Sequence, residues 1–129
     1  MVHEIQIEII QLIAKSLRGN WNKVTCNVEM GDVSGSETIS ALCHIWLGDK
    51  KEQIFPNAEL NMKFRQLRSE MAKNVTNSNS SLISKFIKPN KKVENKVWTI
   101  CDIELNSEGK YQFDFSYEEP PRITKLKNA

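Results

Sequence analysis

The sequence predicts an α+β protein in which helices pack on one face of a single antiparallel sheet. Two long stretches repeat apolar residues every three or four positions, as amphipathic helices do, and several shorter stretches alternate apolar with polar residues, as half-buried strands do. The expected order is a helix, an antiparallel three-strand meander, a long amphipathic helix and a C-terminal β-hairpin. The 129 residues suit one domain, 1–129, with a structured core of about 4–119, a mobile loop at about 74–96 and a flexible tail at 120–129.

The composition is that of a folded soluble protein, with 40% hydrophobic and 26% charged residues. No stretch approaches the roughly 18 consecutive apolar residues of a membrane span. The N-terminal apolar residues are interrupted by Glu4, Glu8 and Lys15, so they do not make the core of a signal peptide. We therefore expect a cytoplasmic protein.

Side-chain spacing identifies both helices. In the first, polar residues recur in steps of four and three, which turns the intervening apolar residues toward a core. These inward residues are Ile5, Ile9, Leu12, Ile13 and Leu17. The second helix follows Asn57, a suitable N-cap, and has Leu60, Phe64, Leu67 and Met71 in the same spacing. Residues 74–81 are polar and turn-prone, and the lysine-rich residues 85–96 are expected to form a mobile loop.

The meander lies between these helices. In the first strand Val24, Cys26, Val28 and Met30 share one face, and residues 31–36 are expected to form a turn. The second strand runs through 39–47, with Leu42, His44 and Trp46 on the face opposite its core residues. A short third strand at 53–55 ends at Pro56.

The C-terminal hairpin has a register that the sequence defines. A three-residue loop with Gly109 in the left-handed conformation pairs Asn106 with Lys110. Leu105 then faces Tyr111, Ile103 faces Phe113 and Cys101 faces Phe115, so all the apolar residues lie on one face. The same register sets Asp102 directly across from Asp114, with Glu104 beside them and Glu118 opposite Trp98.

Charge is segregated along a chain whose net charge is only +2. Residues 61–97 carry nine Lys or Arg against two acids, and residues 98–119 carry six acids against one base. Like charges that face each other across a sheet destabilise it by up to about 1 kcal/mol, a cost typical of a surface that serves a partner. A merely solvated face is the alternative interpretation. The candidate contact residues are Trp98, Asp102, Glu104, Asp114, Tyr117, Glu118 and Glu119.

The sequence contains no recognisable catalytic motif and no metal-ligand spacing. His3 and His44 are far apart, and the adjacent Cys43 and His44 point to opposite faces of a strand. The three cysteines, Cys26, Cys43 and Cys101, are expected to be reduced and mostly buried. These observations predict a binding protein rather than an enzyme, with no metal and no cofactor.

Several segments resemble the YezG-like immunity proteins. A tryptophan-led strand, Trp21-Asn22-Lys23-Val24, follows the first helix, and Phe64-Arg65-Gln66-Leu67-Arg68 is similar to the family's leucine-arginine stretch. The closest similarity lies in Gly109-Lys110-Tyr111 and in the run from Phe113 to Glu119, where alternating residues lead to a tyrosine followed by acids. The resemblance covers residues 5–119. It implies the same order of helices and strands.

The resemblance also implies a function. Such proteins are antitoxins that stay in the cytoplasm and bind the C-terminal domain of a polymorphic toxin, often a nuclease, delivered in contact-dependent growth inhibition or by secretion. The expected partner is a cognate toxin domain, with no membrane and no nucleic acid, and self-association stays open. The alternative is a small nucleic-acid-binding module. It would place Lys85, Lys88, Lys91, Lys92 and Lys96 on phosphates, with Phe86 or Trp98 stacking on bases.

Overall fold

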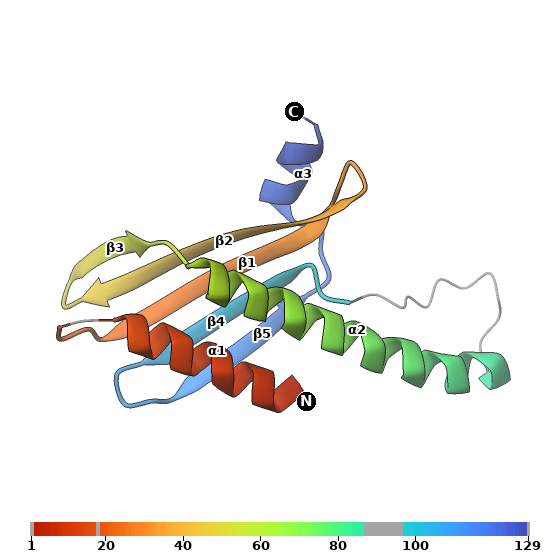
Figure 1. Cartoon of the computed structure of the whole chain (residues 1–129), viewed down its shortest axis with the longest axis horizontal. Coiled ribbons are helices and arrows are strands. Elements are labelled where there is room, and N and C mark those ends of the chain that lie inside the picture. Colours follow the sequence, from red (N-terminus) through yellow and green to blue (C-terminus); the bar gives the residue numbers. More distant parts are fainter. Residues whose placement is uncertain (1, 18, 87–96, 129) are drawn as a thin grey trace.

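A five-stranded antiparallel sheet organises the chain (Figure 1). The computed structural model describes residues 2–17, 19–86 and 97–128, with 74–86 described as backbone only. The strands are β1 (Lys23–Val33), β2 (Ser36–Leu47), β3 (Lys50–Ile54), β4 (Ile100–Asn106) and β5 (Tyr111–Ser116), in the spatial order β3-β2-β1-β4-β5. The helices are α1 (Val2–Ser16), α2 (Ala58–Phe86) and α3 (Pro121–Lys127). The predicted α+β class is confirmed.

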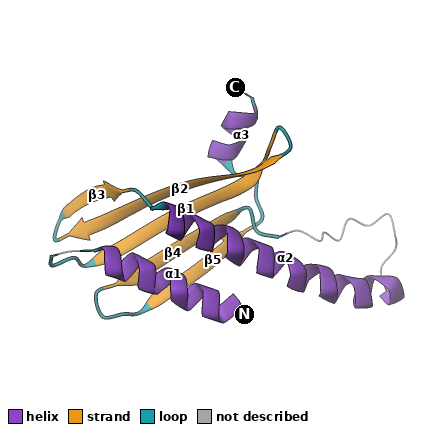
Figure 2. Ribbon diagram, viewed as in Figure 1, coloured by secondary structure: helices purple, strands orange, loops and turns teal. Residues whose placement is uncertain are grey.

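The core lies between the sheet and the two long helices, α1 and α2, which cover one face of the sheet (Figure 2). Ile5, Ile9 and Ile13 recur every four residues along α1 and are at most 2% exposed. Removing each of these side chains from water contributes on the order of 2–3 kcal/mol. They belong to the same cluster as the alternate residues Val24, Cys26, Val28 and Met30 of β1 and Leu60, Phe64 and Leu67 of α2.

The β1–β2 turn is tighter than predicted. β1 continues to Val33, and only Ser34 and Gly35 form the loop, with φ angles of 54° and 84°. A two-residue loop with two positive φ angles matches the twist of the flanking strands, which explains why the strands extend so far. Gly31 is therefore a strand residue. A Cβ atom at this position would lie 3.0 Å from Cγ2 of Ile123, so any larger residue here would have to displace that side chain of α3.

The second helix begins where predicted but is longer. The Leu60 N–H donates to Oδ1 of Asn57 at 2.8 Å, which confirms the N-cap. Residues 74–86, which the sequence placed in a loop at 74–96, continue α2 instead. Asn and Ser disfavour a helix interior by only about 0.5 kcal/mol each, and extending an existing helix needs no new nucleus. The rest of the predicted loop, 87–96, lies outside the described residues.

The predicted flexible tail contains a third helix. α3 starts with Pro121, which has no N–H to satisfy, and the buried carboxylate of Glu29 accepts the next two N–H groups, those of Arg122 at 2.6 Å and Ile123 at 3.2 Å. Glu29 belongs to β1 and points to the sheet face opposite Val28 and Met30. A residue 93 positions earlier in the chain thus caps α3.

No helix in the described part of the chain combines the length and the apolar character needed to cross a membrane.

Candidate binding surface

The sheet face opposite α1 and α2, here called the open face, carries its side chains in rows that run across the strands. Strand pairing aligns Leu42, Asn27, Asp102 and Asp114 in one row, which we call the carboxylate row. The next row is His44, Thr25, Glu104 and Gln112. The third contains Lys51, Trp46 and Lys23, which we call the tryptophan row. A shallow groove of about 400 Å³ lies over the first two rows.

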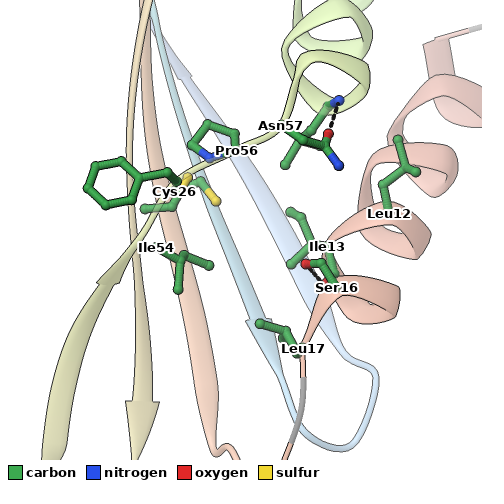
Figure 3. A pocket seen from close by; sticks show the side chains of 11 residues that line it. Leu12, Ile13, Ser16, Leu17, Cys26, Ile54, Pro56 and Asn57 are labelled. Atoms are coloured by element: carbon green, nitrogen blue, oxygen red, sulfur yellow. Dashed lines mark hydrogen bonds between the residues drawn. The ribbon is translucent and has the colours of Figure 1, made fainter.

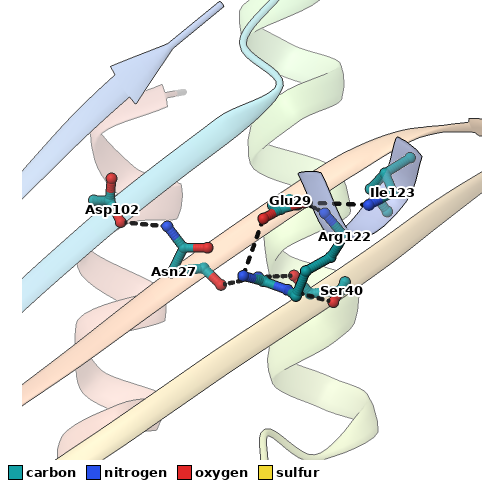
Figure 4. Close-up of polar contacts among 6 residues, drawn as sticks. All are labelled: Asn27, Glu29, Ser40, Asp102, Arg122 and Ile123. Carbon is teal, nitrogen blue, oxygen red and sulfur yellow. Dashed lines mark hydrogen bonds and ion pairs between the residues drawn. The ribbon is translucent and has the colours of Figure 1, made fainter. Parts of the chain in front are cut away.

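The carboxylate row is confirmed in its register, since Asp102 pairs with Asp114. Neutral amides hold both side chains. Asn27 Nδ2 donates to Asp102 Oδ1 at 2.6 Å (Figure 4), and Gln112 Nε2 donates to the two carboxylate oxygens of Asp114 at 3.0 and 2.9 Å. These hydrogen bonds orient the carboxylates but do not cancel their charge.

A third acid, Glu104, lies beside the two aspartates and is 4.0 Å from the ammonium group of Lys23. At that distance, and with both side chains substantially exposed, the attraction is weak. The carboxylate row and Glu104 therefore present negative charge to solvent.

The tryptophan row is cationic and aromatic. The ammonium groups of Lys23 and Lys51 lie 4.7 and 5.3 Å from the centroid of the half-buried Trp46 ring. The His44 ring meets Trp46 edge-on at 6.3 Å. Trp46 lies on the face predicted from the sequence but was not among the predicted contact residues. Its signal was the occurrence of Leu42, His44 and Trp46 at alternate positions on the face away from the core.

Trp98 was predicted to lie with the acids on the outer face, and this prediction is wrong. Ile100 pairs with Ser116, and the Thr99 N–H also donates to the Ser116 carbonyl at 2.9 Å, so two residues of one strand oppose one residue of the other. Such a β-bulge shifts the alternation by one residue. Trp98 consequently points into the core, where it is 1% exposed and packs against Phe115 at 5.8 Å.

The bulge also removes Glu118 from its predicted place opposite Trp98. Tyr117, Glu118 and Glu119 follow the end of β5 and line a separate depression of about 490 Å³ together with Arg68 and Pro120. Tyr117 is 52% exposed, and Thr124 of α3 donates to the Glu119 carboxylate at 3.1 Å. The structure therefore divides the predicted contact residues into an open-face group of Asp102, Glu104 and Asp114, a group at the end of the sheet, and a buried tryptophan.

Residues of the alternative nucleic-acid site are only partly within the described chain. Lys88, Lys91, Lys92 and Lys96 lie outside it, and the side chains of Lys85 and Phe86 are not described. Trp98 is buried and is not available to stack on a base.

α3 bounds the open face at the end near the β1–β2 turn (Figure 1). The guanidinium group of Arg122 lies 3.0 Å from the carboxylate of Glu29 and donates to the carbonyls of Asn27 and Ser40 at 2.8 and 2.9 Å. This cluster was not predicted from the sequence. The signal was Pro120-Pro121, because proline is favoured at the first position of a helix.

A second, smaller pocket lies on the other side of the sheet (Figure 3). It has a volume of about 160 Å³ and lies between α1, the end of β3 and the start of α2. Ser16 Oγ and Asn57 Oδ1 face it. Ser16 Oγ donates a hydrogen bond to the Ile13 carbonyl at the end of α1, and Asn57 Oδ1 accepts one from the Leu60 N–H at the start of α2. Because pockets for drug-sized ligands typically exceed about 300 Å³, this one is too small for such a molecule.

Cys26 and Cys43 line the same pocket and are cross-strand partners. Their mutual hydrogen bond and burial raise the pKa of Cys26, and the same hydrogen bond lowers the pKa of Cys43. Burial, with the negative charges of Asp102 and Asp114, raises the pKa of Cys101. All three are free and buried, as predicted. Among the described residues, no group of three or more His, Cys, Asp or Glu side chains is placed to hold a metal ion.

The structure is a small α+β domain, with two helices packed on one face of an antiparallel sheet and charged and aromatic side chains on the other. The family model described as immunity protein YezG-like matches residues 2–124, so the chain belongs to the YezG-like immunity protein family. The match confirms the resemblance found in the sequence and indicates an immunity, or antitoxin, role, in which the protein binds a cognate toxin. Curated proteins gave no match.

Proposed function

We propose that the chain neutralises a nuclease toxin by covering its cationic substrate surface with the open face of the sheet. The observation that supports this most strongly is the Asp102–Asp114 pair, whose charges face each other on neutral amide donors. Folding gains nothing from this arrangement, because like charges across a sheet are destabilising. A cationic partner would convert that cost into attraction.

A nuclease supplies the matching chemistry. An enzyme that cleaves RNA or DNA presents Lys and Arg side chains to phosphates, and an anionic surface complements them. The carboxylate row and Glu104 provide such a surface on strands held by the core, so binding requires little ordering of the backbone. In this proposal the protein acts in the cytoplasm of the cell that makes it.

The test is co-expression with the toxin domain encoded beside this gene. We expect the two proteins to co-purify, the complex to lack nuclease activity, and cells that produce this protein to survive the toxin. A matched strain that produces the chain with Asp102→Asn and Asp114→Lys should lose protection. A toxin domain that is inhibited but has no nuclease activity when free would contradict the nuclease assignment, and absence of a complex would contradict the function itself.

A further inference from the structure

We propose that Trp46 is the aromatic anchor of the toxin interface, and that the toxin places a carboxylate against Lys23 and Lys51 while its cationic groups contact the carboxylate row. This inference rests on the proposed function and specifies the chemistry of its partner. Trp46 thus replaces Trp98, which is buried, as the tryptophan that contacts the toxin.

The environment of Trp46 suits an anchor. Its ring lies between β3 and β1 partners, with one lysine ammonium at 4.7 Å and the other at 5.3 Å, so the side chain is already ordered before binding. Tryptophan is enriched among the residues that dominate binding energy, and little ordering cost is left to pay. Cation–π attraction also grows when a partner excludes water from the site.

The two lysines retain capacity for an anion. Lys23 is 4.0 Å from Glu104, at the limit of an ion pair, and within the described residues no carboxylate pairs with Lys51. A carboxylate of the partner would therefore meet two ammonium groups that the fold itself leaves largely unpaired.

The spacing between the two rows defines the partner further. Leu42 and Trp46 are four residues apart along β2, which corresponds to about 13 Å at the rise of an extended strand. The partner must carry positive charge and negative charge at least that far apart, because the lysines lie on β1 and β3 and the aspartates on β4 and β5. This requirement disfavours nucleic acid, because a uniformly anionic strand attracted by the lysines would be repelled by Asp102 and Asp114.

The experiment measures binding of the purified toxin domain by calorimetry and by association and dissociation kinetics. Trp46→Ala should weaken binding by about thirtyfold or more, as hot-spot residues do, mostly through faster dissociation. Trp46→Phe should retain part of the affinity. Lys51→Glu should weaken binding, and the affinity that remains should come mainly from the attraction at the carboxylate row. Phe55→Ala is the matched control, because Phe55 is an aromatic residue directly after β3 that is 80% exposed and lines the pocket on the other side of the sheet.

Thermal unfolding of each variant separates binding from folding, and Lys51→Glu tests the site even if Trp46→Ala is unstable. Folded Trp46→Ala and Lys51→Glu proteins with unchanged affinity would overturn the anchor while leaving the proposed function intact, provided that Asp114→Lys still loses binding. Loss of affinity in Phe55→Ala equal to that in Trp46→Ala would also overturn it. If the wild-type chain binds no toxin domain, both the anchor and the proposed function fail.

Discussion

At the residue scale, the sheet carries two facing carboxylates that do not stabilise the fold. Asp102 and Asp114 face each other, and each accepts hydrogen bonds from a neutral amide, Asn27 or Gln112, rather than from a cation. By contrast, the buried acid Glu29 is fully engaged with Arg122 and the start of α3. Their different partners distinguish Glu29, a carboxylate that supports the structure, from Asp102 and Asp114, which are available to a partner protein.

Removing one of the facing charges should therefore not harm the fold. Asp114→Asn keeps an oxygen that accepts a hydrogen bond from Gln112 and relieves the repulsion with Asp102. We expect the free energy of unfolding, measured with urea, to stay constant or rise by up to about 1 kcal/mol. A decrease of more than about 1 kcal/mol would show that the pair is structural.

The buried thiol of Cys101 makes the free energy of unfolding depend on pH in a defined direction. The pKa of Cys101 is raised from its ordinary value of 9.0 by burial, so the folded state retains a proton that the unfolded chain releases. The stabilising effect is complete below pH 9 and is lost as the pH rises further, by up to about 1.4 kcal/mol per pH unit for one thiol. The difference between the wild-type chain and Cys101→Ala isolates this effect from the titration of lysines and tyrosines. Parallel stability curves for the two proteins between pH 8 and about pH 10 would refute it.

At the scale of elements, the sequence predicted what periodicity controls. The side-chain spacing of α1, the N-cap of α2 and the register of the β4–β5 hairpin all follow from local patterns, and the structure confirms them. Three features depend on contacts between distant segments instead. The bulge at Thr99 requires the carbonyl of Ser116, α3 requires the carboxylate of Glu29, and the tight β1–β2 turn leaves Gly31 in the strand that α3 contacts.

The candidate site shows the same division. Alternation placed Asp102, Glu104 and Asp114 on one face correctly, because no irregularity occurs within residues 100–106. It misplaced Trp98 and Glu118, since a bulge is invisible in a pattern of alternating residues. Trp46 was on the correct face in the sequence analysis, but its two lysine neighbours come from β1 and β3, and only the paired strands bring them together.

The attachment of α3 to the sheet is testable through Arg122. Arg122→Ala leaves the 2%-exposed carboxylate of Glu29 without its ionic partner and removes three further hydrogen bonds to β1 and β2. Since the guanidinium is partly exposed, we expect a loss of about 2–3 kcal/mol in unfolding free energy rather than the larger cost of a fully buried pair. Adding Glu29→Gln should recover part of it, because the uncompensated charge is then gone. If the single variant loses less than about 0.5 kcal/mol, the ion pair does not hold the helix.

At the scale of the whole molecule, one face of the sheet is buried and the other is largely exposed. α1 and α2 bury one face and supply the core, and α3 closes one end of the other. What remains exposed is a rigid surface with a negative row and a cationic, aromatic row. The net charge of +2 hides this polarity, because the basic residues of α2 offset the acids of β4 and β5. A protein that is nearly neutral overall can in this way present a local anionic surface to a cationic enzyme.

In the proposed complex the open face, rather than the end of the sheet, binds the toxin. Asp114→Lys and Glu118→Lys make the same change in net charge at the two places, so a comparison of their affinities for the purified toxin domain tests the claim directly. Asp114→Lys should weaken binding by about 2–5 kcal/mol and remove much of the salt dependence of the association rate, measured below and above about 0.1 M salt. Glu118→Lys should change the affinity by less than about threefold. The opposite pattern, with full affinity in Asp114→Lys and a large loss in Glu118→Lys, would contradict the account and place the toxin at the end of the sheet.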